Sequence, residues 1–533
     1  MRAFSQLLDD LVYTRSRNTK LKLIGDYLKE VPDPDRGYGL AALTATLDIP
    51  HVKPAAIRGL VEERIDPVLF HMSRDYVGDT AETVSLLWPK STGEPPEVDD
   101  ATISISEAIE RLRTASKMDA PHVLAAMLDH LDASGRFALL KLALGELRVG
   151  INARLAKQAL ADAFGLEVDA VEEVWHGLTP PFAELFDWAE GRAEQPAVRD
   201  VPVFRPFMLA HPLEETRVSL DDYAAEWKWD GIRVQLVHAG GETRIYSRTG
   251  DDISNSFPDV ADAFRTPGVL DGELLVRGVG QGVADKHGGA AASFNALQQR
   301  LGRKNVSQKM LSSYPAFVRL YDILFDGEQD LRDLPWTDRR GQLEASAGAL
   351  DPERFDISQL IQANSFDELE ELRANARDVA IEGIMLKRRD SPYVAGRRTG
   401  LWYKWKRDPL TADCVLMYAQ RGSGKRSSYY SDYTFGCWGD GDELLPVGKA
   451  YFGFTDEELK WLDRWIRGHT VQRFGPVREV EKSLVLEVAF DSIHASTRHK
   501  SGLAMRFPRV SRIRTDKPAA EADRVSTLQA MVT

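Results

Sequence analysis

The chain contains few of the residues that cross-link small proteins or hold structural zinc. Its 533 residues include two cysteines, Cys414 and Cys437. Two thiols cannot supply a four-cysteine zinc module, and so low a cysteine content is typical of a reducing compartment. Long apolar runs are also absent, and the first ten residues lack the pattern of a signal peptide. We therefore expect a cytoplasmic protein with no membrane partner.

Positive charge is scarce overall, since the formal net charge is -13. An acidic balance argues against a nucleic-acid partner, because phosphate binding favours basic surfaces. The average hides two basic stretches: residues 387–426 hold eleven Lys and Arg against three acidic residues, and residues 498–517 hold seven against one. A basic face on an acidic protein can bind DNA, although solvated surface charge is the simpler alternative.

A chain of 533 residues is too long for one hydrophobic core, and its patterning divides it into about three domains. Residues 1–200 have apolar residues at helical spacing. From 201 to 408, short β-rich runs alternate with helical runs, which predicts an α+β domain built on antiparallel sheets. Residues 409–533 suggest short strands with glycine turns around one helix, which favours a small β-barrel. We expect a loose tail after Pro518.

The most informative stretch is Glu226-Trp-Lys-Trp-Asp-Gly-Ile-Arg233, which places Lys228 two residues before an Asp-Gly turn. Alone, this spacing is equally typical of an ordinary turn. Further motifs follow it in order: Ser247-Arg-Thr-Gly250, Leu270-Asp-Gly-Glu273, Leu320-Tyr-Asp-Ile323, Glu382-Gly-Ile-Met-Leu-Lys387 and Trp402-Tyr-Lys-Trp-Lys406. Together with Arg506-Phe-Pro-Arg509, this set resembles the ordered motifs of ATP-dependent DNA ligases, members of the covalent nucleotidyltransferase superfamily.

The resemblance implies a multidomain fold. It predicts an all-α DNA-binding domain over residues 1–200, an α+β nucleotidyltransferase (adenylation) domain over 201–408 and a β-barrel OB-fold domain over 409–533. The motifs cover roughly residues 140–520, whereas the first 140 residues share only a general helical character. NAD-dependent bacterial ligases resemble the chain in chemistry, but they carry the zinc module that this sequence lacks.

The chemistry of nick sealing explains the need for a lysine. A lysine amine can attack the α-phosphorus of ATP and form a phosphoramidate, which splits one hard step into two easier ones. A free lysine has a pKa of about 10.4, whereas a nucleophilic one needs a value of roughly 7–8. Nearby cations and partial burial both shift the pKa in that direction. By resemblance, Lys228 is the catalytic nucleophile.

The resemblance also implies the remaining site residues. Glu226 would accept a hydrogen bond from the adenine amine, and Tyr321 would stack on the ring where the family usually has Phe. Glu273 would meet the ribose hydroxyl or a metal ion, and Glu382 would help to hold Mg²⁺. Ribose and phosphate oxygens would contact Arg233, Arg248, Arg398, Lys404, Lys406, Arg506 and Arg509. A core aromatic and a solvated Arg-Arg pair remain the alternatives for Tyr321 and Arg398.

In the helical part, Gly145 and Gly150 interrupt the apolar pattern around an arginine. Either the glycines form a helix–helix corner, or a helix N-terminus approaches a DNA phosphate with help from Arg148, Arg154 and Lys157. The stretch resembles one in the helical DNA-binding domain of the larger ligases, which favours the phosphate contact.

We therefore expect a monomeric DNA ligase that uses ATP and Mg²⁺ to seal nicks in double-stranded DNA, in replication, repair or recombination at the nucleoid. An RNA ligase or mRNA-capping-type nucleotidyltransferase would share the lysine chemistry. A non-catalytic DNA-binding scaffold would need only the basic surfaces. Preference for ATP over GTP tests the first alternative, and loss of activity in Lys228→Ala tests the second.

Overall fold

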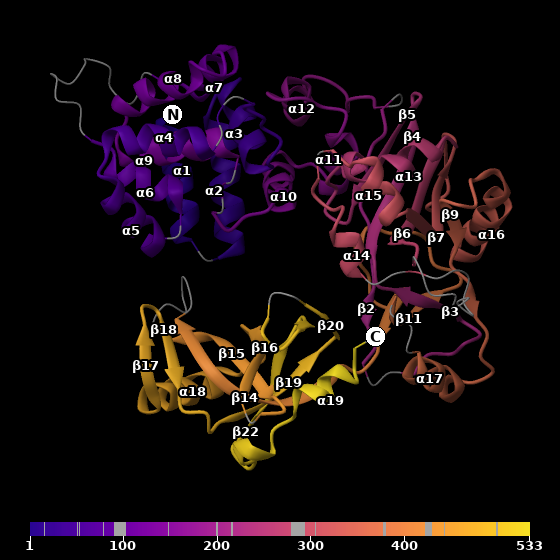
Figure 1. The fold of residues 1–533 in the computed structure, drawn as a ribbon. Coiled ribbons are helices and arrows are strands. Elements are labelled where there is room, and N and C mark those ends of the chain that lie inside the picture. The colour runs from indigo at the N-terminus through magenta and orange to yellow at the C-terminus, as the bar shows by residue number, and fades with distance from the viewer. Residues whose placement is uncertain are drawn as a thin grey trace.

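The computed structural model describes all residues except 15, 51, 53, 78, 90–102, 146, 148, 199–200, 215–216, 279–290, 292–293, 304, 377–379, 422–428, 442, 497–498 and 533. The described residues form three lobes in chain order: a helical lobe in indigo and purple, a central lobe, and a C-terminal lobe in orange and yellow (Figure 1). None of the described helices is long and apolar enough to cross a membrane.

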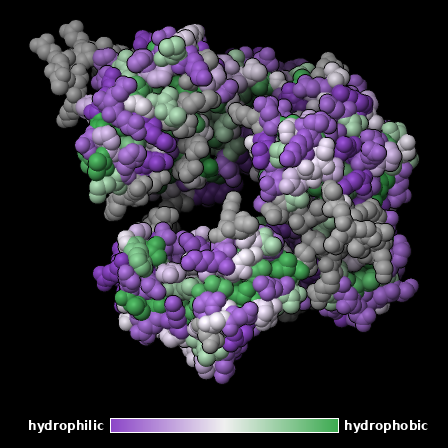
Figure 2. Space-filling model, viewed as in Figure 1, coloured by the Kyte–Doolittle hydropathy of each residue, from purple (hydrophilic) through white to green (hydrophobic). Residues whose placement is uncertain are grey.

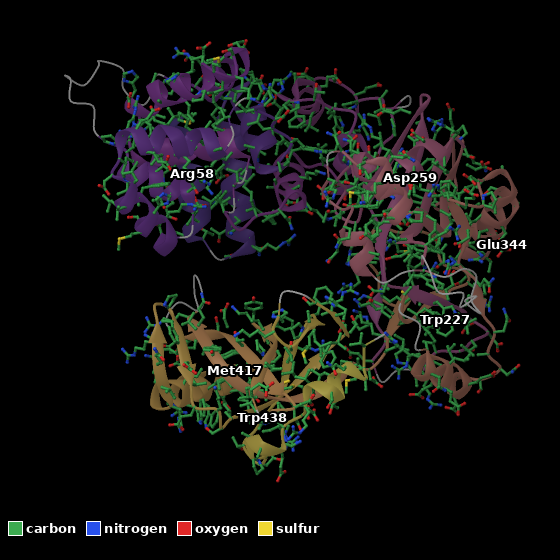
Figure 3. All side chains as sticks on the ribbon, in the orientation of Figure 1. Arg58, Trp227, Asp259, Glu344, Met417 and Trp438 are labelled. Atoms are coloured by element: carbon green, nitrogen blue, oxygen red, sulfur yellow. The ribbon has the colours of Figure 1, made fainter. Side chains whose placement is uncertain are left out.

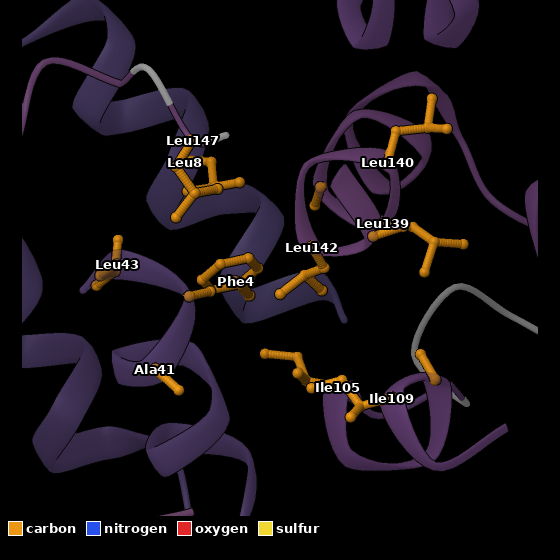
Figure 4. Close-up of a cluster of buried hydrophobic side chains, with 14 of the residues drawn as sticks. Phe4, Leu8, Ala41, Leu43, Ile105, Ile109, Leu139, Leu140, Leu142 and Leu147 are labelled. Atoms are coloured by element: carbon orange, nitrogen blue, oxygen red, sulfur yellow. The ribbon is translucent and has the colours of Figure 1, made fainter. Parts of the chain in front are cut away.

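The helical lobe is a set of amphipathic helices around one apolar core. Helix α1 packs against α9, and Figure 4 shows Phe4 and Leu142 of these helices side by side in that core. Several helices begin at a Ser, Asp or Asn whose side chain accepts a backbone N–H of the first turn, as Asp132 does for Gly135. The helices are α1 (Arg2–Tyr13), α2 (Arg17–Glu30), α3 (Asp35–Leu43), α4 (Pro54–Arg64), α5 (Pro67–Val77), α6 (Thr80–Leu87), α7 (Ile105–Thr114), α8 (Ala120–Asp129), α9 (Ala133–Leu144), α10 (Ala153–Phe164), α11 (Val168–Trp175) and α12 (Ala183–Ala189).

The central lobe contains a sheet in the order β10-β3-β11-β13-β2 and another in the order β5-β4-β6-β7-β8, with β9 beside β7. Most neighbouring strands are antiparallel. The strands are β1 (Met208–Leu209), β2 (His211–Pro212), β3 (Tyr223–Trp229), β4 (Ile232–Ala239), β5 (Glu242–Ser247), β6 (Gly268–Val276), β7 (Ala316–Asp326), β8 (Gln329–Asp330), β9 (Phe355–Ile357), β10 (Leu360–Ile361), β11 (Ile381–Arg388), β12 (Gly396–Arg397) and β13 (Trp402–Lys406). The helices are α13 (Pro258–Ala263), α14 (Phe294–Gln298), α15 (Gln308–Ser313), α16 (Trp336–Ser346) and α17 (Phe366–Asn375).

The C-terminal lobe is built on one antiparallel sheet around a core of its own. Its long strand β14 pairs with β15, β18 and β19 in turn, so the sheet curves around the core. The elements are β14 (Leu410–Arg421), β15 (Tyr430–Trp438), β16 (Leu444–Ala450), α18 (Asp456–Gly468), β17 (Thr470–Phe474), β18 (Val477–Val480), β19 (Val485–Phe490), β20 (Ser492–Ala495), β21 (Leu503–Arg506), β22 (Arg509–Arg514) and α19 (Val525–Gln529).

The segment after Pro518 is not a loose tail, so that prediction is wrong. Val525 and Leu528 of α19 are buried in the core of the C-terminal lobe. Trp438 Nε1 donates to the carbonyl of Ala519 at 2.6 Å, and the Asp523 carboxylate accepts the backbone N–H of Asp413 at 2.8 Å. The polar composition of the segment concealed two apolar residues at helical spacing.

The lobes meet at defined contacts. The helical lobe contacts the central lobe where Glu173 pairs with Arg332 and where His176 packs against Tyr246. In the space-filling view, the three lobes surround a hollow (Figure 2). The C-terminal lobe contacts the central lobe at the cavity described below.

Candidate active site

A cavity of about 460 Å³ lies in the central lobe and faces the C-terminal lobe. Its walls come from β3, β11 and β13 of one sheet and from β4, β6 and β7 of the other, and Arg506 and Phe507 reach it from the C-terminal lobe. Most residues predicted from the motifs line this cavity: Glu226, Lys228, Arg233, Arg248, Glu273, Tyr321, Glu382, Lys404, Lys406 and Arg506.

Lys228 stands on β3 between two buried tryptophans. Side chains alternate along a strand, so Glu226 and Lys228 share the face toward the cavity, whereas Trp227 and Trp229 belong to the apolar core and also border the cavity. The Lys228 side chain is 23% exposed. Its stem is therefore covered while its amine remains within reach of a ligand.

An irregular pairing of β3 with β11 brings Glu382 to Lys228. The register shifts between Ile381 and Gly383, and Gly383 pairs with Lys228. A Cβ at Gly383 would lie 2.3 Å from the carbonyl oxygen of Trp405, so only glycine permits this approach. As a result, Lys228 Nζ lies 2.6 Å from Glu382 Oε1.

The Glu382 carboxylate holds two amines together, since Lys406 Nζ lies 3.2 Å from the same oxygen. Burial raises the pKa of Glu382, but Lys228 and Lys406 outweigh burial and hold that pKa below its usual value. Glu382 is therefore ionised at neutral pH.

Glu273 approaches the same region from β6, where it accepts the backbone N–H of Gly231 at 3.2 Å. A Cβ at Gly231 would lie 2.4 Å from the carbonyl oxygen of Leu274, so the Asp-Gly turn can approach β6 only with glycine. Burial raises the pKa of Glu273 to about 7, although Lys228 and Arg233 oppose the shift.

Glu226 is 2% exposed and is held by two cations. Lys387 Nζ donates to its two oxygens at 3.2 and 3.3 Å, and Arg340 Nη1 donates at 3.4 Å. Lys387 Nζ also lies 4.6 Å from the centre of the Tyr321 ring. Burial raises the pKa of Glu226 and lowers that of Lys387. Sequence reasoning missed Lys387, although it ends a quoted motif, and Arg340, which lies in none of the quoted motifs.

Arg233 is fixed in the cavity wall. Its Nη1 donates to the carbonyl of Met208 at 2.6 Å, and its Nη2 donates to the Asp271 carboxylate at 3.0 Å. The guanidinium lies 4.2 Å from the centre of the Phe207 ring. These contacts hold a cation in a fixed orientation beside the cavity.

Other cations crowd the same wall. Lys404, Arg397 and Arg248 line the cavity together with Lys228 and Lys406. Burial lowers the pKa of Lys404, and the charges of Arg397, Lys228 and Lys406 lower it further. Cations repel one another at this density, so the arrangement is suited to a polyanion such as the phosphates of a nucleotide.

The structure departs from the prediction at Arg398. Arg397 and Arg398 are both exposed, but Arg397, the last residue of β12, lines the cavity, whereas Arg398 is not among the described residues of the cavity wall. Neighbouring side chains of an extended chain point to opposite sides, so a shift of one residue decides which of the two arginines faces the cavity.

Arginines from the C-terminal lobe complete the site. Arg506 pairs with Asp230, the residue of the turn that follows Lys228. Arg509 lies beside a neighbouring cavity that shares Glu382 and Lys406, and its Nη1 donates to Asp491 Oδ1 at 3.3 Å. Arg506 therefore reaches the first cavity directly, whereas Arg509 lies next to it.

The residues predicted to contact DNA differ in their exposure. Lys157 is 5% exposed, and its Nζ lies 2.7 Å from Glu172 Oε2, so its charge is paired inside the helical lobe. The Arg154 side chain is 51% exposed and lies 3.2 Å from Asp169. Arg148 lies outside the described residues. Lys157 is therefore not placed to bind a phosphate at the surface of the helical lobe.

The two predicted metal-binding carboxylates fit a magnesium ion. Glu273 and Glu382 line one cavity, and Mg²⁺ prefers one or two carboxylates together with water and phosphate oxygens. Among the described residues, no group of three or more His, Cys, Asp or Glu side chains forms a preformed metal cluster. Such a pair suits an ion that arrives with a nucleotide.

The chain is similar in sequence and in fold to known proteins. Residues 207–406 match the family model "ATP dependent DNA ligase domain", and residues 426–517 match "ATP dependent DNA ligase C terminal region". A "Probable DNA ligase" of Koribacter versatilis is 32% identical across 98% of this chain and 95% of its own. "DNA ligase 1" of Korarchaeum cryptofilum is 28% identical across 99% and 97%.

A solved structure titled "Pmar-Lig_PreS3" covers 96% of this chain and 99% of its own, with a TM-score of 0.56 and 15% identity. At this identity the likeness is one of fold alone. The helical lobe lies outside the residues that the two family models match. The relatives and family models together show that this chain belongs to the family of ATP-dependent DNA ligases.

Proposed function

We propose that Lys228 is the nucleophile with which this ligase seals nicks in duplex DNA. The observation that carries the proposal is the position of its amine, which lies 2.6 Å from Glu382 in a cavity lined by cations from the central and C-terminal lobes. The amine attacks the α-phosphorus of ATP, a P–N bond forms, and the P–O bond to pyrophosphate breaks. AMP then passes to the 5′-phosphate at the nick, and the 3′-hydroxyl attacks that phosphate and releases AMP.

The remaining residues bind and orient the nucleotide. Glu226 accepts from the adenine amine, and the Tyr321 ring lies against the base. Lys404 and Lys406 neutralise charge at the α-phosphate as it builds. Contacts to ribose and phosphates are proposed for Arg233, Arg248, Arg397, Arg506 and Arg509.

Glu273 and Glu382 would hold Mg²⁺. The ion would supply positive charge to phosphate oxygens. Before it binds, the Lys228 and Lys406 amines balance the Glu382 carboxylate, as the distances show.

Duplex DNA is proposed to occupy the hollow between the lobes (Figure 2). The helical lobe would bind it as a domain of residues 1–200, with Arg148 and Arg154 against phosphates. The adenylation domain would span residues 201–408, and the OB-fold domain residues 409–533. A single copy would suffice, since the lobes of one chain surround the hollow. Binding through phosphates predicts strong salt dependence.

A sealing assay tests this proposal. The purified protein is mixed with Mg²⁺, ATP or GTP, and a labelled duplex that carries either a nick or a one-nucleotide gap. Sealing of the nick with ATP is the expected result. Absence of sealing, with covalent label taken up from α-labelled GTP, would favour a capping-type enzyme, and DNA binding without sealing or covalent label would favour a non-catalytic scaffold.

A further inference from the structure

The carboxylate proposed to recognise adenine is supported from behind by an arginine on another element. Arg340 lies on α16, which occupies the side of the central lobe away from the hollow, where Glu344 is labelled (Figure 3). Arg340 is 7% exposed, and it is not among the described residues that line the nucleotide cavity. Its Nη1 nevertheless reaches Glu226 Oε1 at 3.4 Å.

Arg340 is held rigidly in this place. Its Nη2 donates to the carbonyl of Ser358 at 2.7 Å, and its Nε donates to the exposed Glu344 at 2.6 Å. The Ser358 hydroxyl in turn accepts Trp229 Nε1 at 3.0 Å. The guanidinium therefore has one fixed geometry relative to β3, the strand that carries Glu226 and Lys228.

Among the described residues, the charged groups that act most strongly on Glu226 come from three neighbouring elements, and the titratable Tyr321 on β7 interacts with it as well. Lys387 lies on β11 and Arg340 on α16, and Asp322 lies on β7 with its charge engaged by Arg339 at 2.9 and 3.1 Å. With Lys387 alone, one cation would face a buried carboxylate that burial favours in its neutral form. With Arg340 as well, two cations favour the ionised form.

We propose that Arg340 is a positioning residue that selects ATP over GTP by keeping Glu226 ionised and aimed into the cavity. This inference rests on the proposed role of Glu226 in binding the base. An ionised carboxylate only accepts hydrogen bonds, so it pairs with the amine of adenine and repels the carbonyl oxygen at the same position of guanine. A neutral carboxyl group also carries a hydrogen-bond donor, so it can pair with the carbonyl oxygen of guanine as well as with the amine of adenine.

The test measures covalent labelling of the full chain by α-labelled ATP and by α-labelled GTP, and compares the two values of kcat/KM. In Arg340→Met, the ratio of ATP to GTP labelling is expected to fall on the order of tenfold or more. Arg340→Lys keeps a cation and is expected to retain most of the ratio. Arg300→Met is the matched control. Arg300 is fully buried and its Nη2 lies 2.5 Å from Asp259 Oδ1, and neither residue is among those that line the cavity.

The pH profile separates this role from a purely structural one. Removal of a cation raises the pKa of a neighbouring carboxyl group, so the pH below which the ratio collapses should be higher in Arg340→Met than in wild type. An unchanged ratio and profile in a folded Arg340→Met, or equal effects in Arg300→Met, would overturn the inference. Arg340→Gln takes its place with the same expectations if Arg340→Met does not fold. Wild type that takes no label from ATP would instead refute the proposed function.

Discussion

At the scale of single residues, the site depends on how closely charges of both signs are packed around Lys228. Glu382 brings the amines of Lys228 and Lys406 to one oxygen, at 2.6 and 3.2 Å. A bound phosphate chain would compete with that carboxylate for both amines. Nucleotide binding therefore exchanges one set of ion pairs for another, and each cation that lines the cavity should affect the first step.

Arg397 and Arg398 offer a test with an internal control. Both side chains are exposed, but Arg397 lines the cavity and Arg398 is not among its described lining residues. Arg397→Ala is expected to slow formation of the lysine–AMP adduct on the order of tenfold, because a cation that can bind phosphate is lost. Arg398→Ala should leave the rate close to wild type. Single-turnover labelling measures both rates. A larger effect at Arg398 would support the nucleotide contact that the motifs predict for Arg398.

Sequence reasoning identified residues that touch the cavity better than residues that support it. Lys228 and Glu382 lie in motifs whose spacing reflects the chemistry. Arg340 lies in none of these motifs, because it meets Glu226 from a helix more than a hundred residues away in sequence. Lys157 has a charge that suits DNA, but only the structure shows its partner, Glu172.

At the scale of secondary structure elements, α19 is expected to stabilise the C-terminal lobe. Leu528 is fully buried in the lobe's core, whereas the neighbouring Gln529 is exposed. Leu528→Ala should lower the free energy of unfolding by about 2–5 kcal/mol, since it leaves a cavity. Gln529→Ala should have little effect. Thermal unfolding of the two variants measures the difference, and equal transitions would show that the helix is not part of the core.

The element that joins the helical and central lobes should make stability sensitive to acid. His176 lies after α11, with its ring centre 4.6 Å from that of Tyr246, and burial lowers its pKa to about 3, with Lys157 and neighbouring arginines contributing. The unfolded chain takes up this proton near pH 6.5. Stability is therefore fully present above about pH 6.5 and is lost as the pH falls toward 3, by up to about 1.4 kcal/mol per unit.

His176→Phe tests this linkage. The difference in Tm between the variant and wild type should move in favour of the variant as the pH falls from 7 to 5. His122→Gln, at an exposed site on α8, should show a constant difference. A constant difference for His176→Phe as well would mean that the imidazole becomes charged without cost in the folded protein.

Element types follow from the sequence more readily than element edges. Apolar periodicity indicates helices before residue 200, and alternation indicates the strands around Lys228. Two features required coordinates: the irregular register of β11, which depends on how closely Gly383 approaches β13, and the packing of α19, which depends on two apolar residues in a polar segment.

At the scale of the whole molecule, one ion pair ties the C-terminal lobe to the catalytic turn. Arg506 pairs with Asp230 and lines the cavity, so the lobe is placed to act on the nucleotide. In the proposed mechanism the 5′-phosphate of the duplex has to reach the AMP on Lys228, so we expect this contact to break between the first step and the later ones.

Arg506→Ala should separate these steps. We expect lysine–AMP formation to slow on the order of 10²-fold, because a cation at the leaving group is lost. Sealing of a nick that already carries 5′-AMP should decrease much less. Equal losses in the two assays would contradict a role confined to the closed arrangement of the lobes.

The arrangement of lobes is the part that the sequence predicts least. Motif order indicates which segments share a site, but it does not place the helical lobe across the hollow from the C-terminal one (Figure 1). That placement depends on contacts such as Glu173 with Arg332, whose partners lie in different lobes and outside the motifs quoted above.

The most direct measurement for the account as a whole is a denaturing gel of the purified protein after incubation with Mg²⁺ and α-labelled ATP, GTP or NAD, beside folded Lys228→Ala. Label that stays on wild type with ATP alone, and is absent from Lys228→Ala, is the predicted result. Label that persists in Lys228→Ala, or that comes from GTP or NAD in preference to ATP, would contradict the assignment of Lys228 as the nucleophile of an ATP-dependent ligase.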